Sequence, residues 1–156
     1  AHGARPGAVA EQGLSPPMFS AVLRIAILVS ALALTLLPGP ALAWLSTDMP
    51  WFKLAWGSLD AVRGPFDLPH VALFAAVGFG LSLTQRWPLH WWDGVRIWLI
   101  LLACSLASEA AQAFVPDRNG NWLDVRDDLI GAAIGIVVGM ALRAVWARSR
   151  ERRAAL

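Results

Sequence analysis

The chain has 156 residues, enough for one domain, and carries a formal net charge of +2. Its hydrophobic fraction is 57%, whereas soluble domains are nearer about 45–50% apolar. Charged residues make up only 15%, and the mean hydropathy is +0.54. This composition excludes an ordinary soluble domain and predicts an integral membrane protein. No nucleic-acid-binding motif is present, and Cys104, the one cysteine, cannot form an internal disulfide.

The N-terminal third contains one apolar segment between two stretches rich in proline and glycine. Residues 1–17 lack periodicity and are predicted to form an extended or disordered lead. Residues 25–37 are apolar and follow Arg24. The small-residue sequence Ala-Leu-Ala at 41–43 is also typical of a secretory signal. Because the chain continues through this segment, we favour a first transmembrane helix over a signal peptide.

The connector at residues 44–66 is rich in tryptophan. Trp51, Phe52, Trp56 and Leu59 fall at helical spacing. Tryptophan prefers the interfacial layer of a membrane, so this segment is expected either to lie along the membrane surface or to form an ordered loop.

Three further apolar segments follow, at residues 71–85, 97–116 and 129–146. The first of them is short for a span, which usually needs about 20 residues. We therefore expect Asp67 and His70, just before it, at or slightly below the membrane surface. The predicted fold is an all-α, polytopic membrane protein with four transmembrane helices in a single domain (18–148) and a basic tail (149–156).

The basic residues give this fold an orientation. Nine of the 13 lysines and arginines fall on the side of the two termini and of the second connection; these are Arg5, Arg24, Arg86, Arg96, Arg143, Arg148, Arg150, Arg152 and Arg153. The other side carries Lys53, Arg63, Arg118 and Arg126. The basic excess marks the cytoplasmic side. Both termini are therefore predicted to be cytoplasmic, in a bacterial inner membrane, with lipids as partners.

A polar stripe runs along the third predicted span. Ser105, Ser108, Glu109 and Gln112 recur at spacings of three and four residues and share one helix face. Glu109 precedes Pro116 by seven residues, so it lies roughly 10 Å inside the helix end. A charge at this depth is costly and should face the bundle.

The fourth predicted span carries a second stripe. Asp128 shares one face with Gly131, Gly135 and Gly139, and small residues at this spacing permit close helix packing. Asp124, one turn earlier, continues the same face. Asp127 does not share this face and is expected to point to solvent.

In this topology the polar residues of three segments reach the outward end of one bundle. The set comprises Asp67, His70, Glu109, Gln112, Arg118, Asp124 and Asp128. Asp67 before Pro69 also suits a helix N-cap, Asp124 suits a cap of the fourth helix, and Arg118 is expected to pair with one of the acids. The cluster is either a structural polar lock or a functional site.

A carboxylate–histidine acid–base site is the favoured chemistry for a functional cluster. Glu109, His70 and Asp67 are its candidate catalytic residues, acting on a lipid-linked substrate. Gln112, Arg118, Asp124 and Asp128 are candidate binding residues, with Arg118 suited to a phosphate. Mixed nitrogen and oxygen ligands also make a metal site a weaker alternative, because no HxxxH or HExxH pair is present. We expect no metal and no cofactor.

These motifs resemble the VanZ-like family of small bacterial membrane proteins. "DLPHVALF" is similar to the family's Asp-Lys-x-x-His-Phe element, with Leu68 in place of Lys. "SEAAQAFVPDRNGNWLDV" matches its acid-x-x-Gln element and the loop that follows. "DVRDDLIGAAIG" places Asp128 where the family usually has Asn. Both departures make the cluster more acidic than the family pattern.

The resemblance implies a four-helix membrane fold and leaves the substrate open. Together with the polar cluster, it predicts a protein of cell-envelope or lipid-linked chemistry. The alternative is a non-catalytic accessory subunit that packs against a larger membrane protein complex, which the short chain and the tryptophan-rich flanks would also suit.

Overall fold

The computed structural model describes residues 16–62, 64–85, 88–115 and 120–154, and these residues are mostly helical, with no strand among them. In chain order the helices are α1 (Pro16–Thr35), α2 (Gly39–Asp48), α3 (Pro50–Asp60), α4 (Leu68–Leu83), α5 (Trp91–Gln112) and α6 (Trp122–Ala154). The all-α prediction is confirmed. Residues 1–15 of the predicted lead (1–17) and Arg118 lie outside the described residues, and Pro16 and Pro17 belong to α1.

Three of the described helices, α1, α5 and α6, are long and apolar enough to cross a membrane. Helix α4 is apolar but shorter, with 16 residues. At a rise of about 1.5 Å per residue it is about 24 Å long, which is less than the hydrocarbon thickness of about 30 Å. The short second apolar segment of the sequence is therefore a short helix in the structure.

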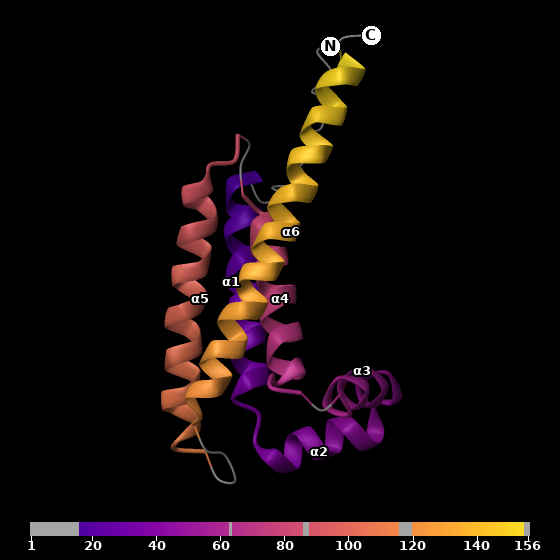
Figure 1. Cartoon of the computed structure of the whole chain (residues 1–156), viewed down its shortest axis with the longest axis vertical. Helices are drawn as coiled ribbons and strands as arrows, with labels where there is room; N and C mark the ends of the chain where they lie inside the picture. The colour runs from indigo at the N-terminus through magenta and orange to yellow at the C-terminus, as the bar shows by residue number, and fades with distance from the viewer. Residues whose placement is uncertain (1–15, 63, 86–87, 116–119, 155–156) are drawn as a thin grey trace, which may run out of the picture.

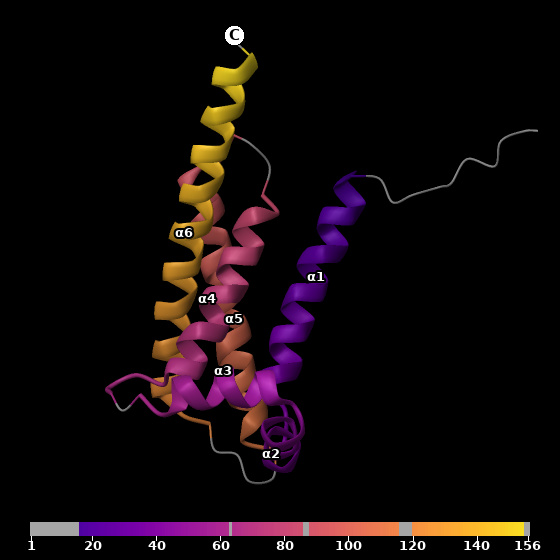
Figure 2. The same cartoon turned by 90° about the vertical axis from the view of Figure 1, so that its right-hand side faces the viewer.

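Helices α1, α4, α5 and α6 run alongside one another, whereas α2 and α3 lie across one end of this bundle (Figure 1). Helix α6 extends past the other helices at its C-terminal end (Figures 1 and 2). The aromatic residues of the connector lie in helix α3, as their helical spacing predicts. The alternative prediction of an ordered loop is therefore wrong for residues 50–60. In α3, Phe52 is buried and stacks on Trp56 with the ring centroids 5.5 Å apart.

Helices α4, α5 and α6 share the hydrophobic core. Its buried members are Phe74, Val77 and Leu81 of α4, Ile97 and Leu101 of α5, and Ala132 and Ile136 of α6. Helix α1 adds partly buried residues, including Ile27 and Leu28, to the edge of this core. It is the most exposed of the three long helices, with 6% of its apolar window buried.

The glycine face of α6 packs directly on the backbone of α4. A Cβ at Gly131 would lie 2.1 Å from the carbonyl oxygen of Val71, and a Cβ at Gly135 would lie 2.0 Å from that of Ala75. Both distances are far shorter than any real van der Waals contact. Only glycine therefore permits this approach of the two helices, as in other small-residue helix pairs of membranes.

Two arginines bind the C-terminal end of α4. Arg24 of α1 donates to the hydroxyl and the carbonyl oxygen of Thr84, at 2.9 and 2.7 Å. Arg143 of α6 donates to the carbonyl oxygen of Leu83. Cationic side chains satisfy the last carbonyls of a helix and interact favourably with its dipole. These bonds hold α1 and α6 to the end of α4 that is remote from the polar cluster.

Candidate functional site

The polar cluster is built at the end of the bundle that α2 and α3 cover. The N-terminus of α4, the C-terminal part of α5 and the N-terminus of α6 meet there (Figure 1). The cluster thus combines residues about 60 positions apart in the sequence, such as His70 and Asp128.

The start of α4 is shaped by Asp67. Its side chain accepts a hydrogen bond from the backbone N–H of His70 at 3.4 Å, and Pro69 occupies the first turn. Asp67 is therefore the N-cap that its position before Pro69 predicts. This cap places His70 in the first turn of α4, directed at α6, while the Asp67 side chain itself stays exposed.

Asp128 is the centre of the hydrogen bonding between the helices. It is fully buried, with 0% exposure. Its Oδ1 lies 2.9 Å from Nδ1 of His70, and its Oδ2 accepts a 2.6 Å hydrogen bond from the Ser105 hydroxyl. One carboxylate thus joins α4, α5 and α6. When Asp128 is ionised, it holds the proton of His70 on Nδ1 and leaves Nε2 as the free ring nitrogen.

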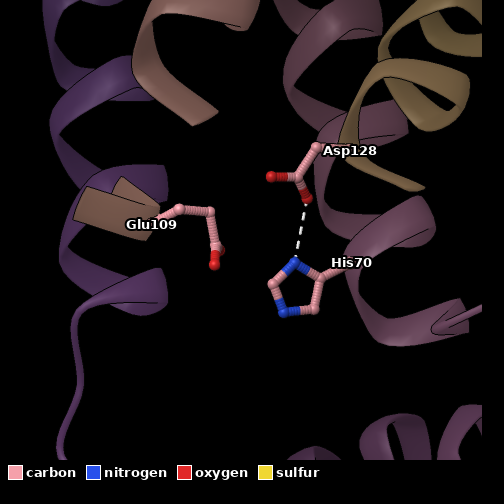
Figure 3. A group of neighbouring side chains, drawn as sticks. All are labelled: His70, Glu109 and Asp128. Carbon is pink, nitrogen blue, oxygen red and sulfur yellow. Dashed lines mark hydrogen bonds and ion pairs between the residues drawn. The ribbon is translucent and has the colours of Figure 1, made fainter. Parts of the chain in front are cut away.

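Glu109 faces the same space from α5. Its residue exposure is 8%, and its Oε2 accepts a 2.6 Å hydrogen bond from the backbone N–H of Asn121. Its Oε1 is buried and has no hydrogen-bond partner among the described residues. One potential ligand atom from each of His70, Glu109 and Asp128 lies within 4.8 Å of the other two. Figure 3 shows the Glu109 carboxylate directed toward the other two side chains.

Other predicted site residues lie outside this group of three. Gln112 is 2% exposed, and its amide donates to the carbonyl oxygen of Thr35 at 3.2 Å, so it ties α5 to α1. Asp124 is half-buried and accepts a 3.1 Å hydrogen bond from the side chain of Asn121. Arg118 lies outside the described residues.

The prediction that Asp127 points to solvent is wrong. Asp127 is 1% exposed and accepts a 2.6 Å hydrogen bond from the backbone N–H of Asp67. Its other oxygen accepts a 2.8 Å hydrogen bond from Arg126. Asp127 lies off the glycine face of α6, and a neighbour outside the helix bundle buries it. The loop that leads into α4 covers the side of α6 on which Asp127 lies.

Two partners of the cluster were not assigned a role from the sequence. Ser105 lies on the polar stripe of α5, and this stripe is the sequence signal for its bond to Asp128. The backbone N–H of Asn121 left no such signal, because any residue type supplies a backbone donor. Its position depends on how the chain enters α6.

Two cavities lie beside the cluster. The larger, of about 400 Å³, is lined by residues that include Asp67, Asp124 and Asp127 and by the loop before α4. The smaller, of about 260 Å³, is lined by Glu109, Gly120, Asn121 and Trp122 among others. A small ligand could approach Glu109 from the second cavity and the acidic ends of α4 and α6 from the first.

A comparison with protein families gives this arrangement a context. The family model described as VanZ/LLP1 matches residues 24–143, which is more than half of the chain. The chain belongs to the VanZ/LLP1 family. No curated protein and no solved structure matches it.

The VanZ/LLP1 match covers most of the bundle. It runs from α1 into α6, and His70, Glu109, Asp128 and the glycine face all lie inside it. The site therefore belongs to the part of the chain that defines this VanZ/LLP1 protein, and the resemblance expected from the sequence motifs is confirmed.

Proposed function

We propose that this VanZ/LLP1 protein is a four-span protein of the bacterial inner membrane whose outward-facing polar cluster performs acid–base chemistry on a lipid-linked substrate of the cell envelope. The observation that carries this proposal is the convergence of Glu109, His70 and Asp128 from three helices that also share a hydrophobic core. Ionisable groups inside a membrane bundle are costly, and they generally mark functional sites.

In this proposal α4 also crosses the membrane, as the second of four spans. Its 16 residues are too few to cross a full hydrocarbon layer alone. The lipid around its N-terminus would therefore be thinned locally, with the tryptophans of α2 and α3 in the interfacial layer. A substrate with its head group at the surface and its chains in the lipid would reach the cluster at this level.

The chemistry follows from the positions of the three side chains. Asp128 orients the His70 ring and leaves Nε2 as the base that takes a proton from a nucleophile. Glu109, buried beside it, is the general acid: in its protonated form it donates a proton to the leaving group. Arg118, which follows α5 in the sequence, is suited to bind a phosphate of the substrate.

Turnover of envelope lipids tests this function. The purified protein in liposomes, mixed with polyprenyl-phosphate-linked and phospholipid substrates, is expected to release products that mass spectrometry detects. Glu109→Gln and His70→Gln should each lower the rate by about 10²–10⁴-fold, the usual contribution of a general acid or base. Glu151→Gln, on the exposed C-terminal part of α6, is the matched control and should keep the rate. Equal rates in all four proteins would refute the assignment.

The proposed orientation places the site outside and the basic end of α6 in the cytoplasm. Ser58 of α3 and Ser149 of α6 are exposed and lie at opposite ends of the bundle (Figure 1). In a Cys104→Ser background, Ser58→Cys is expected to react with an impermeant maleimide added to intact cells without their outer membrane. Ser149→Cys should react only after lysis. The reverse pattern would contradict an outward-facing site.

A non-catalytic accessory subunit is the second candidate, and the exposure of α1 favours it. Only 6% of the apolar window of α1 is buried, which leaves a long apolar face for lipid or for another membrane protein. Purification in mild detergent distinguishes the two functions. Recovery as a lone small protein with turnover supports the enzyme, and stable co-migration with a large complex without turnover supports the subunit.

A further inference from the structure

The two carboxylates of the cluster share a pattern that acid–base chemistry alone does not require. Each has one oxygen held by a hydrogen bond from outside the cluster: Ser105 binds Oδ2 of Asp128, and the backbone N–H of Asn121 binds Oε2 of Glu109, both at 2.6 Å. The second oxygen of Asp128, Oδ1, lies 2.9 Å from Nδ1 of His70, whereas the second oxygen of Glu109, Oε1, has no hydrogen-bond partner among the described residues. This is the arrangement of monodentate metal ligands whose outer oxygens are fixed by neighbouring donors.

The unpaired oxygen of Glu109 points to a missing ligand. Oε1 is buried and has no hydrogen-bond partner among the described residues, and the residue as a whole is more than nine-tenths buried. Figure 3 shows its carboxylate aimed into the space beside His70 and Asp128. A buried acceptor without a donor is costly, and a cation bound between the three side chains would satisfy it.

The spacing of the three side chains is close to that of ligands on one ion. His70 Nδ1 and Asp128 Oδ1 are 2.9 Å apart. Two ligands on the same ion lie about 3.0–3.4 Å apart when each bond is about 2.1 Å long. The Glu109 oxygen lies within 4.8 Å of the other ligand atoms. This separation is wider than that of two ligands on one ion, so binding requires the Glu109 carboxylate to move toward His70 and Asp128.

The charge of the cluster also favours a cation. Asp128 and Glu109 are two acids with one histidine between them, and the described arginine nearest in sequence, Arg126, is paired with Asp127 instead. Two carboxylates this close in an apolar bundle repel each other when both are ionised. A divalent cation removes this repulsion and stabilises both charges.

We propose that His70 Nδ1, Glu109 and Asp128 form a binding site for a divalent cation of the Zn²⁺ or Mn²⁺ type, which displaces to solvent the proton that Nδ1 otherwise donates to Asp128. One imidazole and two carboxylates suit these ions better than Ca²⁺, which takes six to eight oxygen ligands. Three protein ligands leave a position open for water or a substrate oxygen. The inference rests on the proposed function, because it concerns the same site, and it replaces free His70 as the base with water activated by the ion.

Zinc binding by the purified protein tests this site. The probes are Zn²⁺ alone, measured by equilibrium dialysis and elemental analysis, and Mn²⁺ alone, measured by electron paramagnetic resonance. The chain is expected to bind a single ion. Glu109→Gln should weaken binding by more than about tenfold, and Ser105→Ala, which removes only an outer donor, by about 10–100-fold. The Ser105 variant keeps all three ligands and guards against a ligand variant that does not fold.

Control variants distinguish zinc binding at this site from zinc binding by other residues of the chain. His2→Ala/His90→Ala removes the two other histidines of the sequence and should bind like the unchanged protein. Arg118→Gln should bind as tightly or more tightly. Three results would each overturn the proposal. The first is loss of zinc binding in the histidine double variant, and the second is unaltered zinc binding in both Glu109→Gln and Ser105→Ala. The third is zinc binding that occurs only in Arg118→Gln.

The outcomes also distinguish this proposal from the proposed function. Zinc binding without lipid turnover would leave the metal site standing and remove the enzyme. Lipid turnover by chelator-treated protein that binds neither ion would leave the acid–base function standing and overturn the metal site.

Discussion

Gly135→Ala is expected to destabilise the protein by about 1–3 kcal/mol or more, the cost of overpacking a well-packed interface. The added Cβ would lie 2.0 Å from the carbonyl oxygen of Ala75 and 2.8 Å from the backbone nitrogen of Phe79. These are backbone atoms and cannot rotate aside. Helices α4 and α6 would have to separate along the glycine face, and the loss of packing would exceed the gain of up to about 1 kcal/mol in helix propensity.

Gly57→Ala is the matched control for this substitution. It makes the same chemical change in a helix, but apart from the backbone of its own helical turns and its chain neighbours no atom lies within 4 Å of the new Cβ. Its melting temperature in detergent, followed by tryptophan fluorescence, should stay the same or rise, whereas that of Gly135→Ala should fall. Equal melting temperatures for the two variants would show that α4 and α6 do not approach each other as closely as described.

Asp128→Ala is expected to cost about 2–5 kcal/mol of stability, because one half-buried and one buried group lose their acceptor at about 1–3 kcal/mol each. These groups are the His70 ring nitrogen and the Ser105 hydroxyl. Since they belong to α4 and α5, the loss affects the contacts of three helices at once. Asp60→Ala, on the exposed end of α3, should change stability by no more than about 0.5 kcal/mol.

A double-mutant cycle with Ser105→Ala isolates the bond to Asp128. Alone, Ser105→Ala should cost about 1 kcal/mol. In the Asp128→Ala background it should cost less or stabilise, because it removes a hydroxyl that no longer has an acceptor. Unfolding free energies of the four proteins give the coupling energy, expected at about 0.5–3 kcal/mol. A coupling energy of zero would contradict the 2.6 Å bond.

The residue patterns of the sequence anticipated much of the site. Depth in an apolar helix singled out Glu109, spacing placed Ser105 on the same face, and Asp67 before Pro69 marked the helix cap that directs His70. Each of these features depends on neighbours within one or two helical turns, which local periodicity describes well. The pairings between helices did not follow from it.

Gln112 and Asp127 show where local patterns stop. Gln112 shares the stripe of Glu109, yet its amide donates to the backbone of Thr35 in α1 instead of joining the cluster. Asp127 lies off the glycine face, yet it is buried by the loop before α4. In both cases the hydrogen-bond partner is a backbone group whose position depends on a distant segment. The residue types in the sequence therefore do not predict this hydrogen bond.

The amino-acid sequence by itself determined the all-α class, the apolar segments and the glycine face of α6. It also determined which polar residues share one face of a helix. These follow from the helical repeat and from the cost of placing charge in an apolar segment. Only the tertiary structure decided that His70, Ser105 and Glu109 converge on Asp128 while Asp67 caps its helix. The reason is that contacts across three helices depend on how far the helices slide and rotate against one another. That packing is set by the close approach of α4 and α6, which the whole chain determines.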